Sequence, residues 1–443
     1  MQITYLTHQY FPHSVGGTEV YTRGLAVRAQ RAGHSVHLIT HVESSSLDRS
    51  DYRATSTEHE GIPVTEVHYN LSRAKHPARA EYDNQEIAQL LKPELERINP
   101  DIVHAMHAMK LSGAALHLCY EMNLPVVLTL SDYWFICPRH TLIRWNEELC
   151  EGPRDDLDCV RCLHDLHGFG GEVTAKLPRP VLQLTLTVGS KILRDRQPRS
   201  WRDIKAISQR QEYLRDTVQC ADRIIALSDF QKQMFVRNGY AADKIRVLHH
   251  GLETGGLRPA QPHNSDQIEI VFIGSLVYHK GAHILIEALA RRPELKVRLR
   301  IYGNASGANP YLDSIKKLAA ADNRVELMGA FSPDEFGQVL AAADALAMPA
   351  LWYENAPLVV KAAQYVGLPV LASNLGTLAD SIKDGNGVLL PPGDVEAWAD
   401  ALAGFRPQPL AQDCSIKSMD ENSRELLTIY QEIYAARCSK LSI

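Results

Sequence analysis

Short apolar runs alternate along the chain with longer segments whose apolar residues recur at helical spacing. Within 84–98, for example, Ile87, Leu91 and Leu95 fall on one helical face. The alternation of the two patterns predicts an α/β fold built from βαβ units. The expected strands are 3–7, 36–40, 101–104, 126–130, 221–228, 245–248, 268–273, 297–302, 325–329, 345–348 and 369–372, and the expected helices are 18–32, 84–98, 229–238, 282–290, 334–342, 358–365, 395–402 and 420–436.

Two stretches interrupt this pattern. Residues 43–84 are polar and irregular, so we expect a loop with one short strand near Val64–His68. Residues from His249 to Gln267 contain Pro259 and Pro262 and are expected to link two domains. At 443 residues the chain is long enough for two separate cores. We therefore predict domains at 1–255 and 264–415, with a C-terminal helix in 416–443.

Composition narrows the class of protein. Hydrophobic content of 45% and charged content of 22% are those of a soluble globular protein. There is no apolar stretch of about 18 residues that would span a membrane, and the N-terminal residues do not resemble a signal peptide. A net charge of −5 argues against bulk nucleic-acid binding. Eight cysteines fit a reducing compartment, so we expect a cytoplasmic protein.

The segment Asp344–Pro369 carries the most specific chemistry. An apolar run ends at Pro349, a polar loop carries Glu354 and Asn355, and Pro357 stands where a helix can begin. Free backbone N–H groups at the start of a helix form a seat for an anion. Glu354 beside that seat is placed to bind a hydroxyl-bearing ligand. A carboxylate next to a phosphate seat suggests a sugar nucleotide.

The motif Glu-Asn-x-Pro-Leu-Val at 354–359, followed by Gly-x-Pro-Val at 367–370, resembles the nucleotide-sugar site of retaining GT-B glycosyltransferases of the family 4 type (glycosyl transferases group 1). The resemblance covers nearly the whole chain except about 137–215. It implies two Rossmann-like domains that face an interdomain cleft, with the last helix packed back on the first domain. The segment 137–215 would then be a Cys-rich and basic insertion in the N-terminal, acceptor-side domain, and the second domain would bind the donor.

On the donor side, Lys280 stands just before an expected helix, where its charge and the helix start can both meet a diphosphate. Gly16 and Gly17 lie in the first βα loop, where backbone can approach a ligand closely, although such a pair is often only a turn. The resemblance adds further donor contacts. These are Ser275, Leu327, Gly329, Asn355, Ala356, Pro357 and Leu358.

The chain departs from the family pattern at three positions. Ala362 stands where relatives usually have a second Glu, eight residues after Glu354. Ser131 stands where relatives often have a His that touches the transferred sugar, and Ser275 where they commonly have an Arg. A missing carboxylate on the ribose removes about 1.5–3 kcal/mol of charged hydrogen bonding. We therefore expect donor binding weaker by about tenfold to a hundredfold.

On the acceptor side, His104, His107, Ser131 and Asp132 follow the ends of two expected strands. We interpret these polar residues as acceptor-side groups in the cleft. The alternative for His104 and His107 is that they are ordinary hydrogen-bonded loop histidines.

Four cysteines, Cys137, Cys150, Cys159 and Cys162, cluster in the insertion, and the last two form a C-x2-C pair. Four thiolates are the ligand set of a structural zinc site. Unpaired or redox-active thiols and an iron–sulfur cluster are the alternatives. One of the histidines nearby could replace a cysteine; they are His140, His164 and His167.

Basic residues outnumber acidic ones in 178–215, beside the apolar run Val181–Val188. In a net acidic chain this excess suggests an anionic partner, either a membrane surface or a lipid-linked phosphate acceptor. The alternative is a solvated helical face with an ordinary core stripe. The basic residues are Arg179, Lys191, Arg194, Arg196, Arg199, Arg202, Lys205, Arg210 and Arg215.

The resemblance implies transfer of a sugar from a nucleotide diphosphate sugar to the hydroxyl of a saccharide or lipid-linked acceptor, with retention of configuration and no catalytic metal. The setting would be surface polysaccharide or glycolipid biosynthesis, in the cytoplasm or peripherally on the inner membrane face. Two alternatives remain. The fold could persist as a non-catalytic scaffold in a polysaccharide-assembly complex, or the enzyme could use an unusual donor or perform phosphorolysis.

Overall fold

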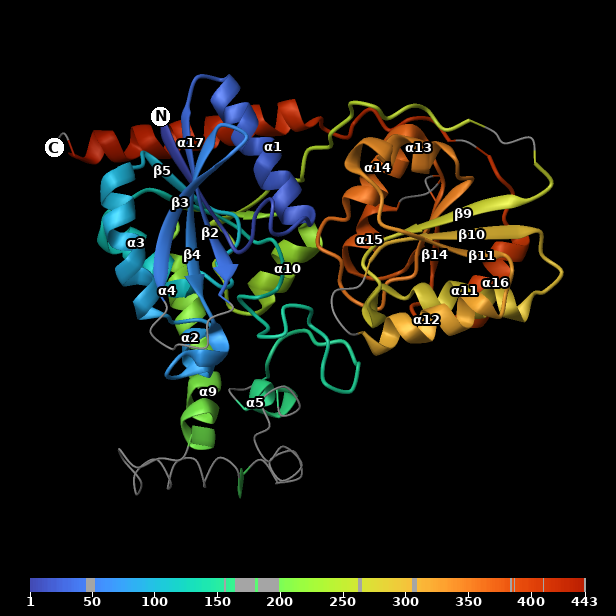
Figure 1. Cartoon of the computed structure of the whole chain (residues 1–443), viewed down its shortest axis with the longest axis horizontal. Helices are drawn as coiled ribbons and strands as arrows, with labels where there is room; N and C mark the ends of the chain where they lie inside the picture. Colours follow the sequence, from blue (N-terminus) through green and yellow to red (C-terminus); the bar gives the residue numbers. More distant parts are fainter. Residues whose placement is uncertain are drawn as a thin grey trace. The chain divides into compact units, whose positions relative to one another are not determined.

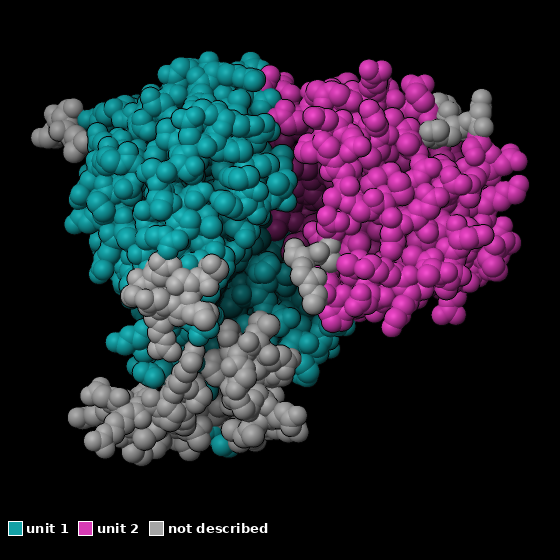
Figure 2. Space-filling model, in the orientation of Figure 1, with its two compact units in different colours: residues 1–227, 232–249, 423–443 teal, residues 228–231, 250–422 magenta. Residues whose placement is uncertain are grey.

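The computed structural model describes residues 1–44, 52–154, 157–163, 180–181, 199–261, 265–304, 309–382, 385, 387–408 and 410–441. The chain divides into two compact units, coloured separately in Figure 2. Unit 1 comprises residues 1–227, 232–249 and 423–443, and unit 2 comprises residues 228–231 and 250–422.

Unit 1 is an α/β unit, as the alternating pattern predicts. Its helices flank a central sheet (Figure 1). The elements in chain order are β1 (Gln2–Thr7), α1 (Gly17–Arg31), β2 (Ser35–Glu43), β3 (Arg53–His59), β4 (Ile62–Tyr69), α2 (Pro77–Ala80), α3 (Gln85–Ile98), β5 (Ile102–Ala105), α4 (Ser112–Glu121), β6 (Val126–Thr129), α5 (Asp158–Cys162), α9 (Arg199–Gln219), β7 (Arg223–Ala226), α10 (Asp229–Arg237), β8 (Ile245–Val247) and α17 (Met419–Leu441).

The sheet of unit 1 has eight strands in the order β3-β4-β2-β1-β5-β6-β7-β8. All pairs are parallel except β3 with β4. From β1 the chain builds outward first through β2 and β4, and then in the other direction through β5 to β8. The strand order therefore reverses between β1 and β5, and α/β sheets bind ligands beside the carboxyl ends of strands at such a reversal.

Strand β3 corrects the prediction of a loop over 43–84. Its sequence, RATSTEH, has no apolar periodicity, and most of its side chains are exposed because it is the edge strand of the sheet. It pairs with β4 through a two-residue turn in which Glu60 and Gly61 both have positive φ, 52° and 76°. Positive φ at both positions is the geometry of a type I′ hairpin, which the sequence pattern of β3 does not signal.

Unit 2 contains a second, wholly parallel sheet of six strands in the order β11-β10-β9-β12-β13-β14. Its elements are β9 (Ile268–Ile273), η3 (Tyr278–Lys280), α11 (Ala282–Arg291), β10 (Val297–Tyr302), α12 (Pro310–Ala320), β11 (Val325–Gly329), η4 (Pro333–Glu335), α13 (Phe336–Ala341), β12 (Ala345–Met348), α14 (Leu358–Val366), β13 (Val370–Ser373), α15 (Gly376–Ser381), β14 (Gly387–Leu390) and α16 (Val395–Gly404).

The apolar residues of β9 alternate between the two faces of this sheet. Ile270 and Phe272 belong to the core cluster that includes α11 and α16. Val271 and Ile273 belong to the cluster that includes α13 and α14. A strand that is buried on both faces needs this continuous apolar sequence. The strand order reverses between β9 and β12, so unit 2 has its own switch point.

In the described residues, no helix combines the length and the apolar character that crossing a bilayer requires.

Helix α17 contributes a buried polar contact to the core of unit 1. The hydroxyl of Tyr430 lies 2.5 Å from Nδ1 of His104 on β5, and the other ring nitrogen of His104 lies 2.8 Å from the Thr129 hydroxyl on β6. Both Tyr430 and His104 are fully buried. A buried ring nitrogen that loses its partner costs about 1–3 kcal/mol.

Tyr430→Phe is therefore expected to lower the free energy of unfolding by about 1–3 kcal/mol, because it leaves Nδ1 of His104 without this partner. Tyr120→Phe is the matched control, since Tyr120 is 61% exposed. Chemical denaturation of both variants tests the expectation. Equal stability of the two variants would contradict it.

Candidate functional site

Lys280 and Glu354 meet at the switch point of unit 2. Lys280 ends the 3-10 turn η3 that follows β9, and Glu354 lies in the loop that follows β12, the strand next to β9. Lys280 Nζ donates to Glu354 Oε1 at 2.6 Å. The side chains are 20% and 6% exposed, so the ion pair is largely shielded from water. Two residues 74 positions apart are thus brought together by the parallel strand order.

Trp352 completes this group, and sequence reasoning missed it. Its indole Nε1 donates to Glu354 Oε1 at 2.8 Å, and its ring lies under the ammonium group, with Lys280 Nζ 4.7 Å from the ring centroid. The contact with Lys280 is a cation–π interaction. An aromatic residue two positions before Glu354 in a polar loop was the available signal. The oxygen of Glu354 is thereby held by two donors.

Gly281 allows the two loops to approach. Its φ is +77°, and a Cβ at this position would lie 1.9 Å from the carbonyl oxygen of Pro349. Next to it, Leu351 N donates to the carbonyl of His279 at 2.8 Å, which ties the loop after β12 to the turn η3. Only glycine satisfies both the backbone angle and the contact. The position of Lys280 is therefore fixed by the close packing of the backbone at Gly281 against the backbone at Pro349.

The helix predicted at 358–365 is confirmed as α14, Leu358–Val366. Pro357 precedes it with φ −68°, and Gly367 ends it with φ 75° in the left-handed conformation. Asn355 is buried, and its Oδ1 accepts from Gln231 Nε2 at 3.2 Å; Ala356, Pro357 and Leu358 are partly exposed. Helix α14 therefore begins at Leu358, shortly after Glu354 in the same loop, and its first N–H groups can bind an anion there.

The other expected donor contacts of unit 2 lie at β9 and β11, which β10 separates in the sheet. Ser275 is exposed just after β9, and Leu327 and Gly329 belong to β11, the edge strand. Leu327 is 37% exposed, and a Cβ at Gly329 would meet nothing within 4 Å. These residues are accessible, and their role in binding a donor stays a prediction.

Ala362 is fully buried in the cluster of apolar side chains between α14 and the sheet. A carboxylate at this position would have to enter that core. The neighbouring Lys361 extends differently, and its Nζ donates to the carbonyl of His250 at 3.1 Å. Burial, with a smaller contribution from the charge of Lys417, lowers the pKa of Lys361 to about 8. Lys361 therefore does not replace the missing carboxylate.

Unit 1 gathers a second polar group at its own switch point. His8 follows β1, and Nε2 of His8 lies 3.7 Å from Oε1 of Glu19 in the first turn of α1. Burial lowers the pKa of His8 well below its usual value and raises that of Glu19. Gly16 and Gly17 form the entry to α1, and a Cβ at Gly16 would lie 2.7 Å from the Glu19 carboxylate. His8 was not predicted from the sequence.

His107 and Asp132 join this group from β5 and β6. Nε2 of His107 lies 2.9 Å from Oδ2 of Asp132, and Nδ1 of His107 accepts from the backbone N–H of Met109. The rings of His8 and His107 are 4.6 Å apart. Burial by itself would raise the pKa of Asp132. The charge of His107 and its hydrogen bond to Asp132 outweigh this effect and lower the pKa to about 2.

The side chains of Ser131 and His104 form hydrogen bonds with partners outside the polar group of His8, His107 and Asp132. The Ser131 hydroxyl donates to the carbonyl of Met106, which ties the exits of β6 and β5 together. His104 is fully buried, with its two ring nitrogens in contact with Tyr430 and Thr129. Its arrangement corresponds to the alternative of a hydrogen-bonded histidine and does not correspond to an acceptor contact.

The four cysteines of the insertion line one small cavity, of about 20 Å³, between Ile136 and α5. All four are free thiols in this structure. Among the described residues, however, no group of three or more His, Cys, Asp or Glu side chains stands in an arrangement that could hold a metal ion. His164 and His167 lie outside the described residues. The described side chains therefore give no support to the zinc site at Cys137, Cys150, Cys159 and Cys162, which stays an untested prediction.

The basic segment is described only in part. Arg179, Lys191, Arg194 and Arg196 lie outside the described residues, as does most of the apolar run after Val181. The described remainder belongs to α9, which carries Arg210 and Arg215.

The lowered pKa of Lys361 makes the stability of the folded chain depend on pH. Between pH 8 and 10.5 the unfolded chain keeps a proton on Lys361 that the folded chain releases, so stability should rise with pH in this window. From pH 7.5 to 9.5 the rise is roughly 1–2 kcal/mol relative to Lys361→Met, which lacks the proton. Chemical denaturation at both values measures the difference. Lys316→Met, at an exposed position of unit 2, should behave like the unaltered protein, and parallel pH profiles for all three would contradict the expectation.

Elemental analysis tests the zinc prediction. About one zinc ion per chain is expected in freshly reduced, full-length protein, and Cys159→Ser should lower this content because it removes one of four ligands. Cys414→Ser is the control, since Cys414 is exposed and does not line the cavity. A metal content near zero in the unaltered protein would refute the prediction.

Comparison with known proteins bears on both units. The family model "Glycosyltransferase Family 4" matches residues 15–152, and "Glycosyl transferases group 1" matches residues 256–420. A curated D-inositol 3-phosphate glycosyltransferase of Nocardioides is 29% identical over 256 residues, which cover 49% of this chain and 55% of that protein. The corresponding protein of Corynebacterium urealyticum is 30% identical over 186 residues, 37% of this chain and 43% of that protein. The chain thus spans about half the length of the curated relatives it matches.

Solved structures share the fold along the whole chain. A glycosyltransferase from Rickettsia africae has a TM-score of 0.61 and 17% identity, with 97% of this chain and 98% of that chain covered. Anabaena HepE, solved in complex with UDP and glucose, has a TM-score of 0.58 and 19% identity, with 100% and 99% covered. The predicted GT-B fold of two Rossmann-like domains is confirmed. Because residues 15–152 match one family model, residues 256–420 match the other, and the fold is shared throughout, the resemblance to GT-B glycosyltransferases of the family 4, group 1 type is confirmed.

Proposed function

We propose that this protein is a retaining glycosyltransferase that moves a sugar from a nucleotide diphosphate sugar to an acceptor hydroxyl. The observation that carries the proposal is the contact between Lys280 and Glu354 at the carboxyl edge of the unit 2 sheet. A cation for the diphosphate and a carboxylate for the sugar are adjacent there, beside the start of α14.

In this proposal Lys280 and the first N–H groups of α14 stabilise the negative charge that develops on the departing diphosphate. Glu354 accepts hydrogen bonds from hydroxyl groups of the donor sugar and fixes its orientation. Lys280 is paired with Glu354 in the free protein, so the donor must enter between two groups that already satisfy each other. When the donor binds, the contact between Lys280 and Glu354 is replaced by two contacts, one from Lys280 to the diphosphate and one from the sugar to Glu354.

The acceptor side is assigned to the group at the unit 1 switch point. His107 and Asp132 form a partly buried pair there, and Asp132 keeps its negative charge down to about pH 2. In a front-face mechanism the departing phosphate takes the proton of the acceptor hydroxyl, so no separate protein base is needed. Ser131 in place of a histidine is compatible with such a mechanism, and Asp132 holds His107 in position.

Solved relatives guide the choice of donor and acceptor to test. Anabaena HepE was solved with UDP-glucose, which makes UDP-sugars the first donors to try. The curated relatives are D-inositol 3-phosphate glycosyltransferases, and WaaG and WaaB act in lipopolysaccharide synthesis. We propose a saccharide or lipid-linked acceptor in surface polysaccharide or glycolipid biosynthesis, with the protein in the cytoplasm or peripheral to the inner membrane face.

A second candidate is a non-catalytic scaffold in a polysaccharide-assembly complex. The observation that favours it is the burial of Ala362 in the apolar core, because this leaves no carboxylate for the ribose at that position. Calorimetry with UDP-, GDP- and ADP-sugars separates the two candidates. Binding of any donor below millimolar concentration favours the enzyme, and no binding at millimolar donor favours the scaffold.

A third candidate is an enzyme that uses an unusual donor or performs phosphorolysis. Product analysis after incubation with a sugar-1-phosphate tests it, since a phosphorylase forms glycosidic product from that substrate and a nucleotide-sugar transferase does not.

Single replacements of Lys280 and Glu354 test the donor assignment. Lys280→Ala should weaken binding of both UDP and UDP-glucose by roughly tenfold to a hundredfold, because it removes a charged hydrogen bond to the diphosphate. Glu354→Gln should weaken UDP-glucose by a similar factor but leave UDP unchanged or tighter, because it removes the sugar contact and releases Lys280 from its ion pair.

Calorimetry with both ligands measures these affinities. Lys316→Ala, an exposed lysine on α12, is the control and should bind both ligands as the unaltered protein does. The assignment would be wrong if Lys280→Ala bound UDP normally, or if Glu354→Gln lost UDP and UDP-glucose to the same degree.

A further inference from the structure

Unit 1 contains a cavity of about 290 Å³ that none of the proposed chemistry uses. It lies between α9, α10 and the loop around Pro153. The charged residues that line it are all arginines, and no carboxylate of the described residues lines it. The four arginines are Arg154, Arg210, Arg215 and Arg237.

Arg210 supplies the decisive observation. It is only 3% exposed, and Nε and Nη2 bond the carboxylate of Glu81 at 2.8 and 3.2 Å, while Nη2 also donates to the carbonyl of Trp134. Its third nitrogen, Nη1, is buried and has no hydrogen-bond partner within the described part of the chain. A buried donor without a partner is costly and calls for an explanation, and a bound ion or water is one such explanation.

Three of the residues that α9 contributes to the cavity form one row. Ile207, Gln211 and Arg215 are spaced by four residues and share one helical face, and they all line the cavity. A Cβ at Gly239 would lie 3.2 Å from Nη1 of Arg215, so the glycine leaves room for this guanidinium. Arg237 forms a 3.8 Å ion pair with the exposed Glu151, and solvent screens this pair.

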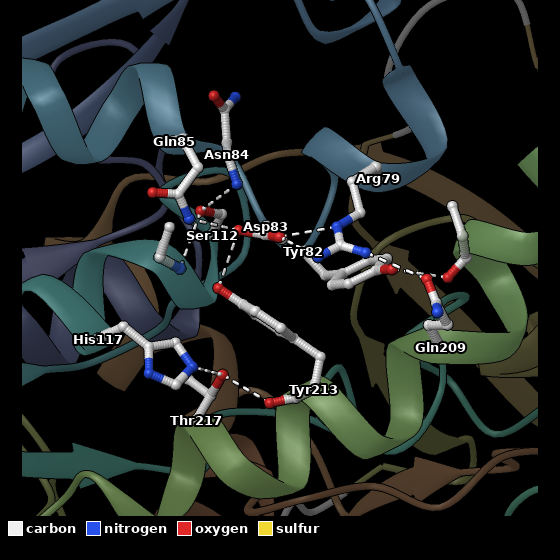
Figure 3. A network of polar contacts seen from close by, with 12 residues as sticks. Arg79, Tyr82, Asp83, Asn84, Gln85, Ser112, His117, Gln209, Tyr213 and Thr217 are labelled. Carbon is white, nitrogen blue, oxygen red and sulfur yellow. Dashed lines mark hydrogen bonds and ion pairs between the residues drawn. The ribbon is translucent and has the colours of Figure 1, made fainter. Parts of the chain in front are cut away.

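A network of hydrogen bonds on another face of α9 holds the helix in place (Figure 3). Tyr213 donates to Asp83 at 3.0 Å, and Arg79 bonds both Asp83 and Gln209. Further along, the Thr217 hydroxyl lies 2.9 Å from Nε2 of His117. Residues 209, 213 and 217 are two positions out of step with 207, 211 and 215, which turns them about 200° around the helix. The row that ends in Arg215 is therefore carried on a fixed helix.

We propose that this cavity binds a phosphate or diphosphate group. Guanidinium groups match phosphate oxygens in charge and in the geometry of their N–H donors. A volume of about 290 Å³ holds a phosphate or diphosphate with part of the group that carries it. The phosphate can belong to a soluble ligand or to a lipid headgroup, since the recognising chemistry is the same. The site is separate from Lys280 and does not depend on the proposed transferase activity.

Calorimetric titration of the full-length protein with sodium pyrophosphate at low ionic strength tests the site. The unaltered protein is expected to bind, and Arg215→Gln and Arg237→Gln are each expected to weaken binding by at least about tenfold. Lys280→Ala should retain this binding, which separates the cavity from a diphosphate seat in unit 2. Arg31→Gln, an exposed arginine outside the cavity, is the control and should bind normally.

The inference is overturned if neither pyrophosphate nor phosphatidic acid vesicles bind, or if both arginine variants bind pyrophosphate as the unaltered protein does. Thermal unfolding shows whether each variant is folded. If Arg215→Gln is not, Arg237→Gln and Arg154→Gln decide the outcome, since both alter exposed side chains.

Vesicle sedimentation identifies the source of the phosphate. Phosphatidylcholine vesicles with and without phosphatidic acid are compared, and binding that needs phosphatidic acid and is lost in Arg237→Gln assigns a lipid headgroup. Pyrophosphate binding without vesicle binding assigns a soluble phosphate ligand. Absence of both kinds of binding refutes the site.

Discussion

The constraint on which the structure depends is that all strands of a parallel sheet end at the same edge. Both sheets reverse their strand order, between β1 and β5 in unit 1 and between β9 and β12 in unit 2. Helices leave in opposite directions at such a point, and the edge beside it stays open to a ligand. The polar group of His107 and Asp132 and the polar group of Lys280 and Glu354 both lie at these reversals.

The two groups differ in how their charges are satisfied. Asp132 is held ionised by His107 within unit 1, so this pair is complete without a ligand. Lys280 and Glu354 also neutralise each other, but each has further bonding capacity, and Trp352 supports both. A largely shielded pair of this kind avoids the desolvation cost of an isolated charge. A ligand that offers a negative and a hydroxyl group can engage both partners without leaving either unpaired.

The sequence allowed the α/β class and most strands and helices to be predicted, because continuous apolar runs and helix-start signals are local. Lys280 and Glu354 were both predicted on the donor side, but not as an ion pair. It did not allow β3 to be predicted, since an edge strand with exposed side chains lacks an apolar pattern. Trp352 and His8 were missed because their contacts with Lys280 and His107 come from the ends of neighbouring strands. His104 was expected to face a ligand, but a partner 326 residues away, Tyr430, buries it in the core.

The glycine that follows Lys280 has a consequence for the design of altered specificity. Because Gly281 packs against the carbonyl of Pro349, the turn after β9 cannot be enlarged without moving β12 as well. The loop after β12 is joined to the same turn by the hydrogen bond from Leu351 to His279, and Asn355 at its far end is buried. Room for a bulkier sugar would therefore require both loops to change together.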